Sequence, residues 1–286
     1  MTEKKTKQTL RVAESTELSQ GVYSLILEYA EGKAPQEVKP GQFVGVYPKD
    51  ASKLLPRPIS ICGWEPEKRQ LRLVYRVAGN GTREFSGWRS GDTADILGIL
   101  GNGYDVPAMA GKKVLLLGGG IGAPPMLGLA GALYAANRQQ GLDADAARKT
   151  VTAVMGYRTN ELFLKEDFQS VSRLLISTDD GTAGFHGNSV AAARELIGAG
   201  ETGTPGTAPF DVICSCGPLP MLRGVKALAE ELGIPAFISL EERMACGIGA
   251  CLGCVARTTK KDEHSRVHNA RICTEGPVFA AEDVEI

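Results

Sequence analysis

The 286-residue sequence lacks a charge imbalance and an apolar leader, and it is poor in histidine. Its 32 basic and 33 acidic residues leave a net charge of −1, so composition indicates neither nucleic acid nor an anionic membrane as a partner. The charged start, Met-Thr-Glu-Lys-Lys-Thr-Lys, precedes no apolar run and therefore does not resemble a signal peptide. We expect a cytoplasmic protein. The three histidines, His186, His264 and His268, are expected at the surface rather than in catalysis.

Repeats and low-complexity tracts are also missing, although glycine accounts for 35 of 286 residues. Nucleotide-binding loops and tight turns are the expected use of that glycine. One uncharged stretch, 114–136, is long enough to span a bilayer. It begins with a β-type run and continues as Gly-Gly-Gly-Ile-Gly-Ala-Pro-Pro, an order that fits a strand, a glycine loop and a helix better than a membrane span.

Four of the seven cysteines lie near the C-terminus in a spacing that carries chemistry. Cys246, Cys251 and Cys254 follow a C-x4-C-x2-C pattern, and Cys273 comes later, which is the plant-type spacing for a [2Fe–2S] cluster. Glycines at 247, 249 and 253 are expected to allow the unusual backbone angles of such a loop. A zinc site would favour two C-x2-C pairs, and a disulfide framework is untypical of a chain this long without a secretion signal.

Two different patterns of predicted secondary structure precede the cysteine-rich segment. From residue 10 to about 103, short β-runs at 22–28, 42–47 and 71–77 alternate with turns, and one helical piece lies near 82–88. This pattern predicts a small antiparallel barrel over 1–106. From residue 107 to 240, β-runs alternate with helices, which predicts a parallel doubly wound sheet. Residues 241–286 are expected to form a small cluster domain.

The predicted barrel carries an Arg-Pro-Ile-Ser motif. Arg57 offers a fork suited to a pyrophosphate, Pro58 stiffens the backbone and Ser60 offers a hydroxyl; alternatively, the motif is only a strand start fixed by proline. Further on, an aromatic face, a second guanidinium and a helix start that could receive a phosphate complete the candidate set. The candidate ligands in this half are Arg57, Pro58, Ile59, Ser60, Val74, Tyr75, Arg76, Gly81 and Thr82.

The glycine loop of the second half matches G-x-G-x-x-A between a strand and a helix, which is the context of a dinucleotide-binding turn. Its candidate ligands are Gly119, Gly120 and Gly122. No carboxylate ends the next strand; Arg158 stands there instead, so the sequence leaves NAD and NADP open. Asp179 and Asp180 follow the third strand and offer carboxylates nearby, although we favour their interpretation as a surface turn.

A second group of candidates ends the fourth strand of this half, where open α/β sheets bind ligands. Cys216, Gly217 and Pro218 follow Cys214 and Ser215 there. We favour a packed strand end whose glycine admits a nicotinamide ring over the alternative, a reactive C-x-C pair.

Taken together, these motifs resemble the ferredoxin reductase superfamily. The order of parts, with Glu241-Glu-Arg-Met-Ala-Cys-Gly-Ile-Gly-Ala-Cys251 and Cys273-Thr-Glu-Gly-Pro-Val-Phe279, is similar to the electron-transfer subunits of NAD-linked dihydroorotate dehydrogenases, from about residue 10 to 280. Two stretches look long for that family: the polar run 258–266 and the Gly-, Thr- and Pro-rich loop 198–209.

That resemblance implies FAD in the barrel, NAD in the second domain and a [2Fe–2S] cluster on the four cysteines. It implies a partner, an FMN-containing catalytic subunit that oxidises dihydroorotate, in an assembly of two subunits of each kind. Two alternatives stay open. A reductase subunit of a hydrogenase or of a ferredoxin–NADP transhydrogenase would share every cofactor motif. A cluster-based redox or iron sensor would carry no flavin.

Overall fold

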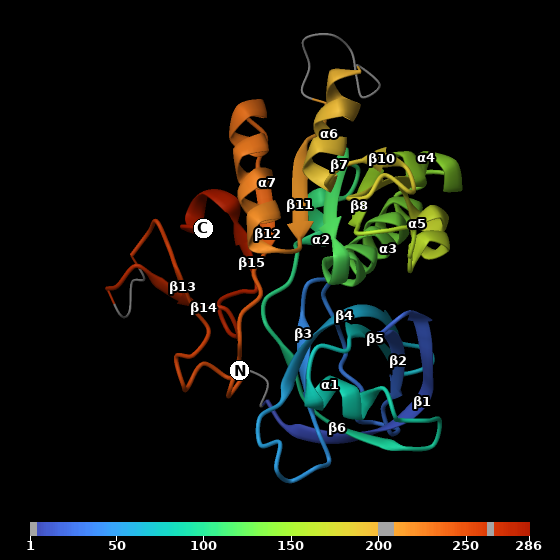
Figure 1. Cartoon of the computed structure of the whole chain (residues 1–286), viewed down its shortest axis with the longest axis vertical. Helices are drawn as coiled ribbons and strands as arrows, with labels where there is room; N and C mark the ends of the chain where they lie inside the picture. The colour runs from blue at the N-terminus through green and yellow to red at the C-terminus, as the bar shows by residue number, and fades with distance from the viewer. Residues whose placement is uncertain (1–4, 200–208, 262–265) are drawn as a thin grey trace.

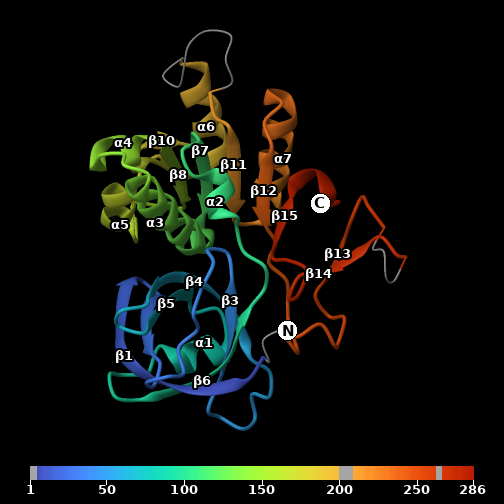
Figure 2. The ribbon, with the colours of Figure 1, turned by 180° about the vertical axis from the view of Figure 1, so that it is seen from behind.

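Two lobes lie one above the other, and a smaller C-terminal segment lies beside them (Figure 1). The computed structural model describes residues 5–199, 209–261 and 266–286. Most of the expected loop 198–209, part of the polar run 258–266 and His264 therefore lie outside the described residues. The view from behind shows the same arrangement, with the C-terminal segment reaching from the upper lobe down beside the lower one (Figure 2).

The N-terminal lobe is a closed barrel with strand order β1-β2-β5-β4-β3-β6, and its paired strands are antiparallel. Alternate residues point inward, so Leu71, Leu73 and Tyr75 of β5 fill the interior. A short helix, α1, follows β5. The elements are β1 (Lys7–Ser19), β2 (Val22–Glu28), β3 (Phe43–Tyr47), β4 (Arg57–Glu65), β5 (Gln70–Arg76), α1 (Asn80–Phe85) and β6 (Thr93–Leu100).

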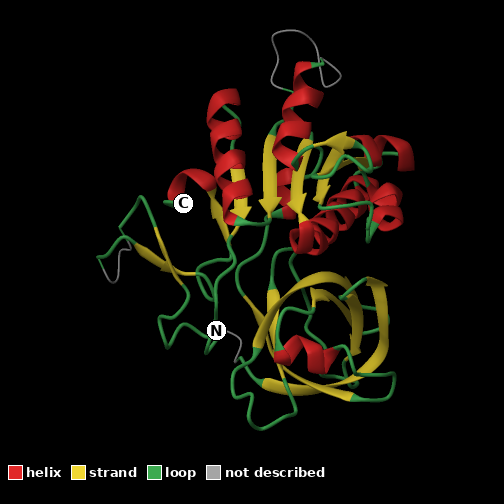
Figure 3. Cartoon of the chain, viewed as in Figure 1, coloured by secondary structure: helices red, strands yellow, loops and turns green. Residues whose placement is uncertain are grey.

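The upper lobe is a sheet of order β10-β9-β8-β7-β11-β12-β15, with helices on both faces (Figure 3). Its first six strands run parallel. Its elements are α2 (Val106–Met109), β7 (Val114–Gly119), η1 (Gly120–Gly122), α3 (Ala123–Gln139), α4 (Ala144–Lys149), β8 (Val151–Tyr157), α5 (Lys165–Val171), β9 (Arg173–Thr178), β10 (Phe185–His186), α6 (Ser189–Gly198), β11 (Val212–Cys216), α7 (Leu219–Leu232) and β12 (Ala236–Ser239).

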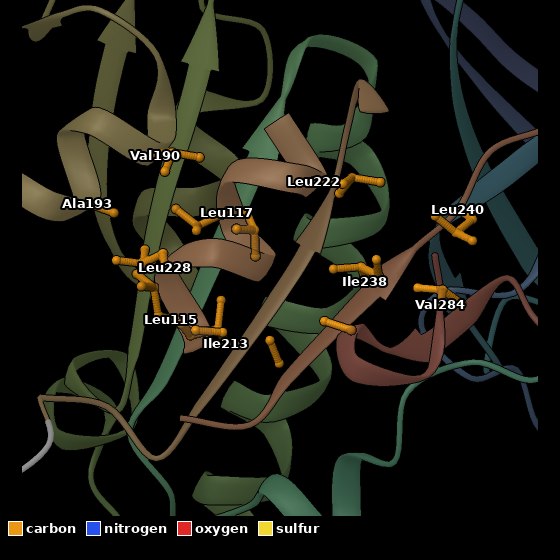
Figure 4. Close-up of a cluster of buried hydrophobic side chains, with 14 of the residues drawn as sticks. Leu115, Leu117, Val190, Ala193, Ile213, Leu222, Leu228, Ile238, Leu240 and Val284 are labelled. Carbon is orange, nitrogen blue, oxygen red and sulfur yellow. The ribbon is translucent and has the colours of Figure 1, made fainter. Parts of the chain in front are cut away.

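Strand β7 shows why this lobe needs helices on two sides. Leu115 and Leu117 pack with α6 and α7, as Figure 4 shows, whereas Val114 and Leu116 pack in a second cluster with α3. A strand buried on both faces must be apolar throughout, which explains the uncharged run in the sequence. The stretch 114–136 is thus β7, η1 and most of α3. None of the helices in the described ranges is both long and apolar enough to cross a membrane.

The C-terminal segment contains β13 (Val255–Arg257), β14 (Asn269–Arg271), β15 (Val278–Ala280) and η2 (Ala281–Asp283). Strands β13 and β14 form a small hairpin, but β15 joins the large sheet by pairing antiparallel with β12. The structure confirms the predicted barrel, parallel sheet and C-terminal cluster segment. It adds that the last segment closes back onto the sheet instead of standing as a separate body.

The two lobes pack tightly along α3 and β4. Gly128 of α3 lies so close to the barrel that a β-carbon there would come 2.9 Å from the carbonyl oxygen of Cys62. Arg72 of β5 reaches across and pairs with Asp167 of α5, with both guanidinium Nη atoms 3.1 Å from Oδ2. The relative position of barrel and sheet is therefore held by backbone contact as well as by an ion pair.

Candidate functional site

The C-terminal segment brings the four predicted cluster ligands together as two pairs. Cys246 interacts with Cys251, and Cys273 interacts with Cys254. Cys254 and Cys273 are buried, whereas Cys251 is exposed. Their backbones are tied as well, because the N–H of Ile272 donates to the carbonyl of Cys254 at 3.0 Å.

Backbone N–H groups surround these sulfurs. Gly249 donates to Sγ of Cys273 at 3.2 Å, Cys251 donates to Sγ of Cys246 at 3.4 Å, and Gly253 donates to Sγ of Cys251 at 3.4 Å. Partial burial acts to raise the pKa of Cys246, but the N–H groups of Ile248 and Cys251 outweigh it and lower that pKa to about 6. Such N–H···S bonds favour thiolates and tune the potential of a bound cluster.

Glycine serves this loop at two of the three expected positions. Gly247 and Gly249 have φ of +69° and +81°, the left-handed region that glycine adopts without strain. The expectation for Gly253 is wrong: the positive φ, +57°, belongs to its neighbour Leu252. A β-carbon at residue 253 would lie 3.5 Å from Sγ of Cys251, an ordinary contact distance, so the contacts of this residue do not require glycine.

The donor set fits a two-iron cluster better than a single ion. Within the described ranges, no three or more side chains of His, Cys, Asp or Glu are arranged to hold one metal ion. A [2Fe–2S] cluster has no such need, because four thiolates are shared between its two irons. The two thiol pairs of this loop match that requirement.

On the barrel, the start of β4 and the start of α1 meet. The guanidinium of Arg57 lies over Gly81, where a β-carbon would come 2.5 Å from Nε. Its Nη1 donates to the carbonyl of Leu55, and no carboxylate among the described residues forms an ion pair with it. The hydroxyl of Thr82 is occupied in the turn, where it accepts from the N–H groups of Ala78 and Gly79. Arg57 is therefore the cationic group available to an anionic ligand here.

The aromatic face expected from Tyr75 is not available to a ligand, because side chains alternate between the two faces of β5. Its ring is buried inside the barrel, edge-on to Phe85 with 5.9 Å between centroids, so it offers no aromatic face to a flavin outside. Val74 faces the other way and packs against the upper lobe, and Arg76 is exposed. Because side chains alternate along a strand, the side chain of Tyr75 lies on the opposite face of β5 from those of Val74 and Arg76.

A cleft of about 670 Å³ lies where the strand order reverses between β7 and β11. Open α/β sheets bind ligands at this switch point, and the volume suits a nucleotide. The candidate ligands Gly119, Gly120, Gly122, Gly217 and Pro218 all line it. Arg76 reaches in from the barrel, so the predicted flavin strand and the cleft share an edge.

Gly122 makes the closest approach in this cleft. A β-carbon there would lie 2.1 Å from the carbonyl oxygen of Cys216, which only glycine avoids. Cys216 itself is completely buried and does not line the cleft. Burial, followed by the nearby carboxyl of Glu241, raises the pKa of Cys216 well above its usual range, and burial does the same for Cys214. The reactive-pair alternative therefore has no support, since neither thiol is accessible or ionised.

Sequence reasoning missed several residues of the cleft. Glu241 lines it, with Oε1 3.7 Å from Sγ of Cys216, and desolvation by the surrounding protein raises the pKa of its carboxyl. Met221, Asn188 and Ser189 line it from α7 and the start of α6. Glu241 begins the motif that runs to Cys251, but nothing in that motif indicated that its side chain reaches the cleft. For Asn188 and Ser189 the only signal was that their segment follows a strand at the carboxyl edge of the sheet.

The choice between NAD and NADP depends on the charged side chains that line the cleft. Arg158 lines it, and so do the carboxylates of Glu161 and Asp179. Asp179 is an exposed turn residue, as interpreted, and it also forms part of this wall. Asp180 does serve the turn, since its Oδ1 accepts from the N–H and the hydroxyl of Thr182.

Comparison with known proteins agrees with this geometry. Residues 241–285 match the family model described as the iron–sulfur cluster binding domain of dihydroorotate dehydrogenase B. The dihydroorotate dehydrogenase B (NAD(+)) electron transfer subunit of Listeria monocytogenes serotype 4a (strain HCC23) is 37% identical over 279 residues, 97% of this chain and 98% of that protein. The subunit of the same name from Shouchella clausii (strain KSM-K16) is 38% identical over 96% of each chain.

Solved structures share the fold. The NADH-dependent reduced ferredoxin-NADP oxidoreductase superposes with a TM-score of 0.75 at 24% identity, over 96% of this chain and 89% of that one. A ferredoxin NADP+ reductase from Neisseria gonorrhoeae, solved with FAD and NADP bound, gives 0.63 at 17% identity, over 84% and 95%. With the fold, the four paired thiols and more than 35% identity along nearly its whole length, this chain belongs to the electron transfer subunits of dihydroorotate dehydrogenase B.

Proposed function

We propose that this chain carries electrons from the flavin of a dihydroorotate-oxidising partner, by way of a [2Fe–2S] cluster and FAD, to NAD⁺. The observation that supports this order is the contiguity of the three candidate sites. The cluster loop rests on the barrel, where a β-carbon on Gly247 would lie 3.1 Å from Cδ1 of Leu100. The barrel in turn contributes Arg76 to the nucleotide cleft.

Each cofactor is assigned to its own set of residues. The cluster would be held by Cys246, Cys251, Cys254 and Cys273. FAD would be held by Arg57, Pro58, Ile59, Ser60, Val74, Tyr75, Arg76, Gly81 and Thr82, with Tyr75 contributing backbone only. The nicotinamide nucleotide would be held by Gly119, Gly120, Gly122, Gly217 and Pro218, with Cys216 supporting the loop from behind.

A bound flavin would supply the conversion between hydride transfer and single-electron transfer, and the residues of this chain would position the groups involved. Arg57 would neutralise phosphate charge at the barrel. Gly122 and Gly217, which have no side chains, would leave room in the cleft for the nicotinamide nucleotide. Glu241, which lines the cleft, would offer its carboxyl as a hydrogen-bonding group to a bound nucleotide.

The relatives are named electron transfer subunits, which implies that they work with a catalytic partner subunit. We propose that this partner contains FMN and docks over the cluster loop, where the exposed ligand Cys251 is flanked by exposed Ile248 and Leu252. We further propose two subunits of each kind per assembly. The proposed compartment is the cytoplasm, where the cysteines of this chain, none of which forms a disulfide, would stay reduced.

The test is purification of the tagged chain from its native cell under anaerobic conditions. We expect the eluate to contain FAD and an FMN protein in equal amounts and two irons per FAD, to reduce NAD⁺ when given dihydroorotate, and to have the mass of a two-plus-two assembly. An eluate that contains FAD and iron but is inert with dihydroorotate would contradict the proposed partner. It would favour the ferredoxin–NADP oxidoreductase alternative, which shares the fold.

The sensor alternative is tested on the isolated chain. A sensor would hold a cluster without flavin, whereas a reductase releases FAD on denaturation in proportion to its protein concentration. The Arg57–Gly81 contact and the cleft at the switch point both favour the reductase.

A further inference from the structure

Asn102 connects the barrel to the segment that follows the last cluster ligand. It lies just after β6, in the link between the lobes. Its Nδ2 donates to the carbonyls of Val278 at 2.7 Å and Glu275 at 3.1 Å. Its Oδ1 accepts from the N–H of Val278 at 3.1 Å, and its own N–H donates to the carbonyl of Gly276 at 2.7 Å. Four bonds thus join one residue to 275–278.

On the barrel side, this residue is two strands away from the proposed flavin motif. Leu100, at the end of β6, pairs with Phe43 of β3, and Phe43 pairs with Ser60 of β4. The preceding Gly101 (φ +80°) is clamped, since a β-carbon there would lie 2.6 Å from Pro277. Its carbonyl accepts from Nε2 of Gln42 at 2.9 Å. Asn102 therefore moves with the strands that carry Arg57 to Ser60.

On the other side, the bonded segment begins two residues after Cys273. Thr274 and Glu275 donate their N–H groups to the carbonyl of Arg271, which folds the chain tightly around Cys273. Ile272, on the opposite side of this ligand, is bonded to Cys254. A displacement of 275–278 would therefore displace the Cys254–Cys273 pair as a unit.

We propose that Asn102 is a positioning residue that sets the distance between the Cys254–Cys273 half of the cluster and the flavin strands of the barrel. The inference rests on the proposed electron path. The rate of electron transfer falls steeply with distance. The four hydrogen bonds of Asn102 therefore affect electron transfer between flavin and cluster, and they leave hydride transfer in the cleft unchanged. Asparagine suits the task because it donates and accepts at once, whereas aspartate would place a carboxylate against the two carbonyls.

The experiment compares Asn102→Asp and Asn102→Ala with the wild type. In cofactor-loaded protein, anaerobic stopped-flow spectroscopy follows flavin reduction by NADH and the subsequent bleaching of the cluster. Hydrogen–deuterium exchange of residues 273–280 measures whether the hydrogen bonds between Asn102 and this segment are intact. Two controls match the aspartate change: Asn269→Asp adds the same charge at an exposed position of β14, and Asn137→Asp breaks a buried amide, bonded to Gly111 and Thr150, in the upper lobe.

For Asn102→Asp we expect cluster bleaching to slow about tenfold while flavin reduction keeps its rate. Exchange of 273–280 should quicken about tenfold, in keeping with the loss of one or two hydrogen bonds. Asn102→Ala should show the same pattern more weakly. Both controls should leave the ratio of the two rates unchanged, even where Asn137→Asp lowers the melting temperature.

An unchanged ratio of rates in Asn102→Asp, or equal slowing of both steps, would overturn the proposal. If a variant fails to hold iron, exchange is compared between the iron-free forms, and equal protection of 273–280 would likewise overturn it. Failure of the proposed function would look different: in the wild type, NADH would reduce the flavin and never the cluster.

Discussion

The guanidinium of Arg57 lies directly against the α-carbon of Gly81, although the two residues are on different elements, β4 and α1. A β-carbon on residue 81 would be 2.5 Å from Nε and 2.8 Å from Cζ of Arg57. The position of the arginine, and with it the proposed pyrophosphate site, therefore depends on the absence of a side chain at residue 81.

Gly81→Ala is expected to weaken FAD binding about tenfold, the equivalent of one lost charge-assisted hydrogen bond. Alanine is the better helix former, so the loss would come from displacement of Arg57 and not from α1 itself. FAD released on denaturation, per mole of protein, measures the effect. Gly79→Ala is the control because no atom lies within 4 Å of a β-carbon there. Equal FAD content in both variants would remove Arg57 from the site.

Cys251→Ala is expected to abolish the visible absorption of the cluster and all turnover linked to the partner. Oxidation of NADH by an artificial two-electron acceptor should continue, because the barrel and the cleft lie outside the cluster loop. Iron content and the two activities are the measurements, with Cys62→Ala, a buried thiol of the barrel, as the control. Loss of both activities in a folded, FAD-containing variant would contradict the electron order.

Gly128→Ala and Gly131→Ala make the same change within α3 with opposite expectations. At residue 131 a β-carbon meets open space, and the gain in helix propensity should stabilise the protein by up to about 1 kcal/mol. At residue 128 it would press on the carbonyl of Cys62 and separate the lobes. We expect Gly128→Ala not to be stabilised and to reduce its flavin more slowly with NADH. Thermal unfolding and stopped-flow rates test both, and identical behaviour would mean that the lobes do not rely on this contact.

Asp179→Ser is expected to improve the use of NADPH relative to NADH by about tenfold, roughly 1.4 kcal/mol, because a carboxylate in the cleft wall repels a 2′-phosphate. Arg158, in the same wall, would then be free to attract that phosphate. Asp180→Ser is the control, since its carboxylate is used by the Thr182 turn. The ratio of kcat/KM values for the two nucleotides is the measurement. No change in Asp179→Ser would place the source of selectivity elsewhere.

Local patterns were sufficient for much of this protein. The cysteine spacing predicted a loop whose thiols do pair, and the alternation of β-runs and helices predicted the parallel sheet. Helix α7 (Leu219–Leu232) is one of the helices that alternate with strands in that half of the chain. These features depend on neighbours in the sequence, because capping, periodicity and ligand spacing act over a few residues.

Tertiary structure decided the features that depend on distant segments. The inward ring of Tyr75 follows from which face of β5 the barrel encloses, and Glu241 reaches the cleft only because β12 ends beside β11. Asn102 meets 275–278 across more than 170 positions of sequence. The sequence by itself determined which cofactors the chain is suited to bind, since their ligands are local motifs. How those sites are spaced was settled only when the barrel, the sheet and the C-terminal segment packed together, because that spacing is set by contacts no local pattern encodes.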